Sequence, residues 1–330
     1  MNNEYAAEQK KNDTFFIKMK KLYLKSIKPV QTDEPVVAFF FRPVGFLIAL
    51  LSSGLKLTPN MLTVVRALLG ITAGICFIPG TAAATAAGAI ILFAATFFDV
   101  ADGQLARIQE KFSRMGTIID GIGDGLTVGA VYMASAWALY SRDPASGMYW
   151  WVMCLLAVIS FLIQLNSYGF LRHEYIYYVI ENSTEKRDTF EEINREIKNI
   201  DTKGEKTKKN KILLTILMIF NIGLIESASR ILLHKKYKGY NSWYRKAGSV
   251  PDTQKEKFRT DYKKNNGWLL QLFGNLGMGS NLLVFTVAGL FNRLDLGIYT
   301  ILIIFNLYYL LLVIIQQISF RVQLKKAAAI

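Results

Sequence analysis

Four aspartates within 26 residues are the side chains of this sequence best suited to chemistry. They are Asp99, Asp102, Asp120 and Asp124, and they lie in two consecutive, largely apolar segments. A carboxylate inside a membrane costs about 2.5–3.5 kcal/mol on insertion scales, so four together require a compensating partner. Two divalent cations would balance the four negative charges, and hard oxygen ligands suit Mg²⁺ or Mn²⁺. We therefore expect a site that holds two divalent ions.

Helical spacing predicts that these carboxylates face one another. At about 100° per residue, five residues of the first segment fall within an arc of about 140°: Asp99, Asp102, Gly103, Ala106 and Arg107. Three residues of the second segment share one face at i, i+4 spacing: Gly116, Asp120 and Asp124. The connecting turn is short, so the two helices are expected to be antiparallel neighbours. Metal ions there would clamp the oxygens of a pyrophosphate, and Arg107 could add donors to them. This chemistry is phosphoryl transfer beside a membrane.

The composition indicates which elements position these residues. Hydrophobic residues make up 52% of the 330, and runs of about 18–25 apolar residues alternate with short basic stretches. A disordered chain, a disulfide scaffold and an ordinary soluble enzyme are excluded. The net charge of +14 gathers at the ends of the apolar runs, which fits anionic lipid and membrane orientation and not nucleic acid. We expect an all-α integral membrane protein.

Six segments are candidate transmembrane helices. They are residues 60–78, 82–106, 116–140, 148–173, 268–291 and 297–320. Two further apolar segments, 36–55 and 212–233, are interrupted by polar residues, and we expect them to lie in the membrane interface. Basic residues concentrate in the loops on one side, so the positive-inside rule places both termini and the aspartates at the cytoplasmic face of a cell inner or cytoplasmic membrane.

The same pattern divides the chain into four parts. Residues 1–57 are expected to form a cytoplasmic arm with an interfacial helix, and 58–178 the first four spans with the aspartates. Residues 179–266 form a basic cytoplasmic or interfacial insert, and 267–330 hold the last two spans and the tail.

The aspartate pattern also resembles a known family signature. Asp-x2-Asp-Gly-x2-Ala-Arg-x8-Gly-x3-Asp-x3-Asp, matched here in every fixed residue from Asp99 to Asp124, is similar to that of the CDP-alcohol phosphotransferases. The resemblance extends to the Thr58–Thr63 sequence that opens the first span and to the six-span plan. It covers roughly residues 42–178 and 268–322 and says little about the insert.

The resemblance implies an enzyme, a fold and a set of roles. An alcohol would attack the phosphate next to a CDP-linked alcohol, such as CDP-diacylglycerol, and CMP would leave. Asp99, Asp102 and Asp120 would hold the metals, and Asp124 would be both a metal neighbour and the general base. The CDP site would be lined by Gly103, Ala106, Arg107 and Gly116. The resemblance also implies a homodimer.

The identity of the acceptor depends on residues outside the fixed pattern. Gly125 follows the last aspartate, where members with a phosphorylated acceptor often have Lys or Arg, and Gly121 stands where choline-type members often have His. The Arg42–Pro43 pair and the Asp99–Arg107 sequence look more like members that act on inositol-type head groups. Three arginines near the cytoplasmic mouth either bind an acceptor phosphate or simply follow the positive-inside rule: Arg114, Arg172 and Arg230.

Two other functions remain open on these residues. A prenyltransferase also places aspartates and Mg²⁺ at membrane helices, but its two acidic motifs differ and lie far apart in the chain. A divalent-cation transporter would line a path with carboxylates, yet aspartates at one membrane face beside Arg107 argue against a path through the membrane. Metal-dependent release of CMP separates all three.

Overall fold

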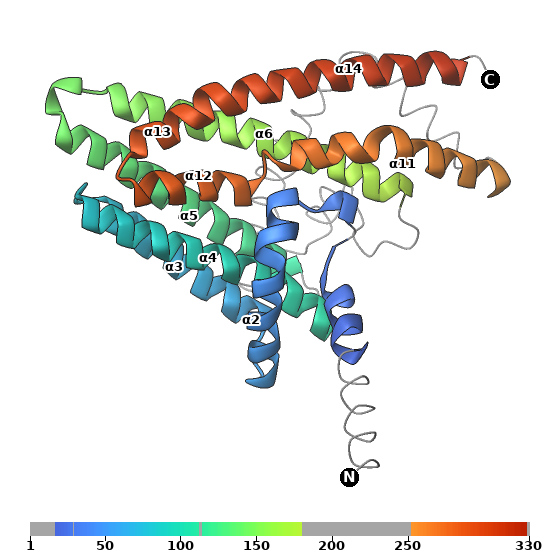
Figure 1. The fold of residues 1–330 in the computed structure, drawn as a ribbon, viewed down its shortest axis with the longest axis horizontal. Helices are drawn as coiled ribbons and strands as arrows, with labels where there is room; N and C mark the ends of the chain where they lie inside the picture. Colours follow the sequence, from blue (N-terminus) through green and yellow to red (C-terminus); the bar gives the residue numbers. More distant parts are fainter. Residues whose placement is uncertain (1–16, 29, 112–113, 180–251, 329–330) are drawn as a thin grey trace, which may run out of the picture.

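The computed structural model describes residues 17–28, 30–111, 114–179 and 252–328. Every element in these ranges is a helix, and the longest of them lie side by side in a bundle (Figure 1). The predicted all-α membrane bundle is confirmed. The insert from 180 to 251, including the interfacial helix expected at 212–233, lies outside the described residues.

Four helices form the first part of the bundle. They are α3 (Pro59–Phe77), α4 (Ala82–Gln109), α5 (Arg114–Arg142) and α6 (Tyr149–Val179). Short turns make them antiparallel in sequence order, and α3 packs against both α4 and α5. Pro59 starts α3 at a position where proline costs no helical hydrogen bond. At the start of α4 the Thr81 hydroxyl accepts a hydrogen bond from Ala84 N–H. The C-cap residue of the helix is Glu110, whose backbone has the left-handed conformation (φ 54°).

The C-terminal part adds one interrupted helical span and one continuous one. The first is α11 (Asp252–Gly274) followed by α12 (Met278–Leu290), separated by a turn at 275–277. The second runs through α13 (Leu294–Tyr299), the π-helix η6 (Thr300–Phe305) and α14 (Asn306–Ala328). Helix α11 packs on α6 while α12 packs on α4, so the break lets one span contact two different parts of the bundle.

The N-terminal part of the chain packs against the bundle mainly through α4. Residues 17–26 are helical, and they are followed by η1 (Val30–Thr32), the π-helix η2 (Val37–Phe41) and α2 (Arg42–Gly54). Arg42 begins α2 in an apolar setting because its guanidinium forms a two-pronged ion pair with Asp33, at 2.6 Å and 2.8 Å. Both residues are buried, so the pair neutralises a charge that the apolar helix could not otherwise contain.

Six of the described helical stretches are long and apolar enough to cross a membrane. Five coincide with predicted spans: Pro59–Phe77, Ala82–Gln109, Tyr149–Ile176, Arg259–Leu290 and Leu294–Phe320. The sixth is Val37–Gly54, expected in the interface, whereas the predicted span at 116–140 is not among them. Two aspartates and several glycines reduce the hydropathy of α5, which nevertheless packs inside the bundle between α3 and α6. Helix α2 instead runs crosswise to the bundle (Figure 1), the direction expected of an interfacial helix.

The core of the bundle combines small and aliphatic side chains with a few large aromatic ones. Phe77 of α3, Phe161 of α6 and Phe285 of α12 are fully buried, or within 1% of it, in one core cluster. Tyr132 stacks edge-on against Phe285 and accepts a hydrogen bond of 3.0 Å from the Asn281 amide. This polar contact inside an apolar core fixes α5 against α12, and therefore fixes the helix that carries Asp120 and Asp124.

Candidate metal centre

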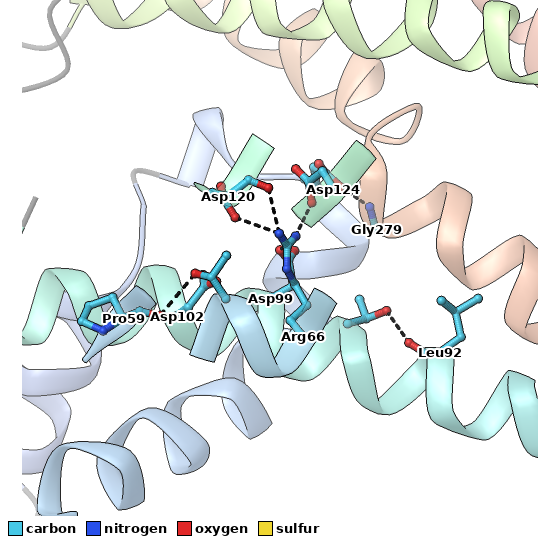
Figure 2. A network of polar contacts seen from close by, with 11 residues as sticks. Pro59, Arg66, Leu92, Asp99, Asp102, Asp120, Asp124 and Gly279 are labelled. Carbon is cyan, nitrogen blue, oxygen red and sulfur yellow. Dashed lines mark hydrogen bonds and ion pairs between the residues drawn. The ribbon is translucent and has the colours of Figure 1, made fainter. Parts of the chain in front are cut away.

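Three of the four aspartates meet beside α3, one from α4 and two from α5. Asp99 on α4 and Asp120 and Asp124 on α5 each offer a carboxylate oxygen, and these oxygens lie within 4.8 Å of one another. Figure 2 shows the three side chains converging on one point. The expected convergence of carboxylates from the two segments is therefore present, but the expectation that α4 and α5 are packed neighbours is wrong, because each of them packs mainly on α3.

A fourth side chain, which the sequence reasoning missed, occupies the centre of this cluster. Arg66 comes from α3, and its Nη1 lies 2.6 Å from Asp99 Oδ1 and also pairs with Asp124 Oδ1. Its Nη2 lies 3.2 Å from Asp120 Oδ1 and donates to the Asp120 main-chain oxygen at 2.9 Å. The Arg66 side chain is only 4% exposed. One signal could have revealed it, because an arginine within a predicted span requires a negative partner.

Asp102 lies beside the triad but faces a different helix. Its Oδ2 accepts a hydrogen bond of 2.7 Å from the Thr63 hydroxyl, and the residue is 8% exposed. The Thr63 hydroxyl also approaches the Pro59 carbonyl at 3.2 Å, so the first turn of α3 fixes this contact (Figure 2). Of the four predicted metal ligands, the structure thus brings three together and places the other one helical turn away.

Glycines let the helices and Arg66 approach one another closely. A Cβ added to Gly123 would lie 2.6 Å from Arg66 Nη2, so α5 leaves space for the guanidinium by lacking a side chain there. A Cβ on Gly70 would overlap Thr127 of α5, which shows how tightly α3 and α5 pack. Gly103 lies beneath the Arg107 guanidinium, with its added Cβ at 3.3 Å from Nη2.

The residues expected around a CDP site lie at the adjoining ends of α4 and α5. Gly103, Ala106 and Arg107 are on the last turns of α4, and Gly116 is on the first turn of α5. The Arg107 Nε donates to the Ser26 main-chain oxygen, and the Gln104 amide donates to the Ser26 hydroxyl at 3.2 Å. The segment before α2 therefore covers this end of α4.

A group of cations borders the same end of the bundle. The pKa of Lys28 is lowered to about 8, first by the positive charge of Arg172, then by burial and by Arg42 and Arg107, while Asp33 opposes the change. Positive charges strong enough to shift an amine in this way must be close neighbours. Of the three arginines suggested for an acceptor phosphate, Arg172 belongs to this group. Arg230 and the side chain of Arg114 lie outside the described residues.

The triad fits a divalent cation. The ligand atoms are all carboxylate oxygens, the type that hard divalent ions prefer. The Oδ1 atom of Asp120 is buried and accepts no hydrogen bond among the described residues; its one charged contact is the ion pair with Arg66, so it retains capacity to bind a cation. The three carboxylates therefore offer the ligand set for a divalent ion.

Comparison with known proteins points to one family. Residues 56–234, which is 179 of the 330 residues, match the sequence profile of the family described as CDP-alcohol phosphatidyltransferase. A stretch of 119 residues is 39% identical to a phosphatidylinositol phosphate synthase of Corynebacterium glutamicum. That alignment covers 35% of this chain and 53% of the relative, so the chain spans about half the length of the curated relative it matches.

Proposed function

This chain belongs to the CDP-alcohol phosphatidyltransferase family, and from that premise we propose that it is a membrane enzyme of phospholipid synthesis. It transfers a substituted phosphate from a CDP-alcohol, such as CDP-diacylglycerol, to the hydroxyl of an acceptor alcohol, and CMP is released. One observation carries the proposal: three of the four aspartates of the family signature converge on a single point from α4 and α5. The activity follows from that convergence because a pyrophosphate needs concentrated positive charge, which metal-binding carboxylates recruit.

The proposed roles follow the positions of the side chains. Asp99, Asp102, Asp120 and Asp124 would hold two divalent ions, Mg²⁺ or Mn²⁺, which neutralise charge on the donor's phosphates. The ends of α4 and α5 would bind the CDP portion through Gly103, Ala106, Arg107 and Gly116. Gly103 has no side chain, so a ligand can approach the helix backbone, and Arg107 offers a planar fork of donors for phosphate oxygens.

Asp124 is proposed to take the proton of the acceptor hydroxyl. It lies at the end of the Gly116, Asp120 and Asp124 face, one turn from Asp120, and about a third of its side chain is exposed (37%). A general base must reach the hydroxyl at about 2.6–3.2 Å, and a partly exposed carboxylate leaves room for that approach. Divalent ions bound beside it would favour the ionised form, the state in which it can accept a proton.

We propose an inositol-type acceptor that carries a phosphate. The relative from Corynebacterium glutamicum is named for a product that contains both inositol and phosphate. Gly125 lacks the cation that often follows the last aspartate in members with phosphorylated acceptors. The cations around Lys28 supply positive charge at the same end of the bundle from a different element, the segment before α2. That group could bind the acceptor phosphate in place of a residue at position 125.

The proposed arrangement in the membrane follows from charge. The basic loops place the site at the cytoplasmic face, with α2 in the interface and five described spans together with α5 across the bilayer. The four-part division at residues 57/58, 178/179 and 266/267 and a homodimer of this chain complete the proposal. Helix α11 begins at Asp252, so the insert would join the fifth span through a continuous helix.

Metal-dependent CMP release is the decisive test. Purified full-length protein would be incubated with CDP-diacylglycerol or CDP-choline and with inositol, inositol phosphate or glycerol phosphate, and CMP would be measured. We expect CMP with CDP-diacylglycerol and inositol phosphate, no CMP in EDTA, and recovery with Mg²⁺ or Mn²⁺. Asp120→Asn should abolish release, while Asp143→Asn, in an exposed turn between α5 and α6, should not. Pyrophosphate release from a prenyl diphosphate, or ion flux without CMP, would overturn the proposal.

A further inference from the structure

Arg66 places a permanent positive charge at the point where the negative charges converge. Its guanidinium contacts carboxylates of Asp99, Asp120 and Asp124, and its side chain is 4% exposed. The Arg66 Nε is buried and finds no acceptor among the described residues, so the side chain still has one donor to offer. An arginine keeps its charge at any physiological pH. The charge of the site is therefore set by five residues rather than four.

The space for this guanidinium is part of the fold. Gly123 of α5 faces Arg66, and a Cβ there would lie 2.6 Å from Nη2. A methyl group there would require the guanidinium to move, and the contacts with Asp120 and Asp124 would move with it. By contrast, a Cβ on Gly129, further along α5, would meet no atom within 4 Å.

Charge arithmetic shows what Arg66 changes. Four aspartates and Arg66 together carry −3, so one divalent ion leaves −1 and a second leaves +1. A doubly negative pyrophosphate diester then returns the site to −1. Without Arg66, two divalent ions would neutralise the four carboxylates completely, and the pyrophosphate would leave the site at −2. Uncompensated charge is costly where water is scarce. The free energy of binding the two ions and the pyrophosphate therefore differs between a site with Arg66 and a site without it.

We propose that Arg66 is a positioning residue that makes entry of the second divalent ion depend on the donor's pyrophosphate. It holds the three carboxylates together before any ion binds, and it permits one ion in the nucleotide-free protein. The second ion and the pyrophosphate then bind together, because each offsets the charge that the other introduces. This inference rests on the proposed function, since it requires a CDP-linked donor at a site with two ions.

An arginine that only joined helices would behave differently. Its removal would lower the stability of the protein but leave the number of bound ions and their dependence on nucleotide unchanged. The two roles are therefore separated by counting ions, a measurement that does not depend on turnover.

The test is a Mn²⁺ titration followed by electron paramagnetic resonance of the free ion, with purified full-length protein in detergent. The unmodified protein should bind one Mn²⁺ without nucleotide and two in the presence of CDP. Arg66→Met should bind two without CDP, with the affinity for Mn²⁺ raised at least about tenfold because a nearby positive charge is gone. Arg66→Lys keeps the charge and should restore the behaviour of the unmodified protein. Gly123→Ala should shift toward Arg66→Met, while Gly129→Ala should not.

Each result decides one question. Two Mn²⁺ ions bound to the unmodified protein without CDP, or a single ion in a folded Arg66→Met sample, would overturn the role of Arg66. If Arg66→Met does not fold, Gly123→Ala can be compared with Gly129→Ala, because both variants retain Arg66. Equal numbers of bound Mn²⁺ ions in these two variants would then overturn the role of Arg66. No Mn²⁺ bound to the unmodified protein with or without CDP would instead overturn the proposed function.

Discussion

Replacing Glu34 by glutamine should make the protein more stable at neutral and alkaline pH. Glu34 precedes η2, and its Oε2 accepts a hydrogen bond of 3.0 Å from Gly279 N–H in the first turn of α12. A Cβ on Gly277 would overlap the Glu34 carboxyl group, so the glycine makes room for it. A helix N-terminus attracts a negative charge, yet burial works against ionisation of this carboxyl.

The effect of burial is the larger one, and the pKa of Glu34 is raised from 4.5 to about 7. The hydrogen bond from Gly279 and the charge of Lys28 oppose the increase, while Asp99 and Asp33 add to it. In the unfolded chain Glu34 loses its proton near pH 4.5, whereas the folded protein keeps it until about pH 7. The free energy of unfolding therefore falls as the pH rises between these values.

The size of the effect follows from the pKa difference. An increase of about 2.5 at 1.36 kcal/mol each gives an upper value of about 3 kcal/mol. Because the Glu34 side chain is only partly buried, solvent screening reduces this to about 1–3 kcal/mol. Glutamine keeps an oxygen for Gly279 N–H and has no charge to lose, so the Glu34→Gln variant avoids the loss.

Thermal unfolding in detergent with EDTA, from pH 4.5 to 8, measures the difference. For a protein of this size, 1 kcal/mol corresponds to about 1–2 °C in the melting temperature. The variant should melt with the unmodified protein at pH 4.5 and a few degrees above it at pH 8. Glu256→Gln, an exposed site on α11, serves as the matched control and should give no divergence. Parallel curves for Glu34→Gln and the unmodified protein would refute the reasoning.

Three further predictions concern the base, the buried ion pair and the topology. Asp124→Asn should keep CDP affinity in binding assays while turnover falls by about 10²–10⁴-fold, and turnover within a few-fold of the unmodified protein would exclude a base there. Asp33→Asn should destabilise the fold by about 3–5 kcal/mol in denaturant unfolding because it leaves Arg42 buried and unpaired; an unchanged midpoint would contradict this. An impermeant thiol reagent added outside cells should label Ser146→Cys but not Lys56→Cys, and the reverse pattern would invert the proposed orientation.

The sequence predicted the metal centre better than its surroundings, for physical reasons. Helical periodicity relates residues within one segment, and the short turn after α4 brings the start of α5 to the same end of the bundle, so Asp99, Asp120 and Asp124 could be placed together although α4 and α5 both pack on α3. Neither principle says which face of α3 meets them, so Arg66 was missed. The same ignorance of α3 hid the hydrogen bond from Thr63 that orients Asp102 away from the triad.

The membrane segments were predictable by hydropathy wherever a helix faces lipid. That measure fails for α5, whose polar residues serve the site, and it accepts Val37–Gly54, whose one charged residue is neutralised by a partner outside the segment. The break at 275–277 depends on the contact of Glu34 with Gly277 and Gly279, residues more than 240 positions away in sequence. Local patterns carry no information on such a contact.

The segment before α2 also has a consequence for how the protein is made. Its contacts reach forward in the chain: Ser26 to Arg107, Thr32 to Tyr168 at 2.9 Å, and Glu34 to Gly279, separations of 81, 136 and 245 residues. These residues leave the ribosome before all three partners, and the last partner is inserted only with the span that contains α12. This segment must therefore wait at the membrane surface while the helices between are made, and its contacts at the end of α4 and α12 are completed late in folding.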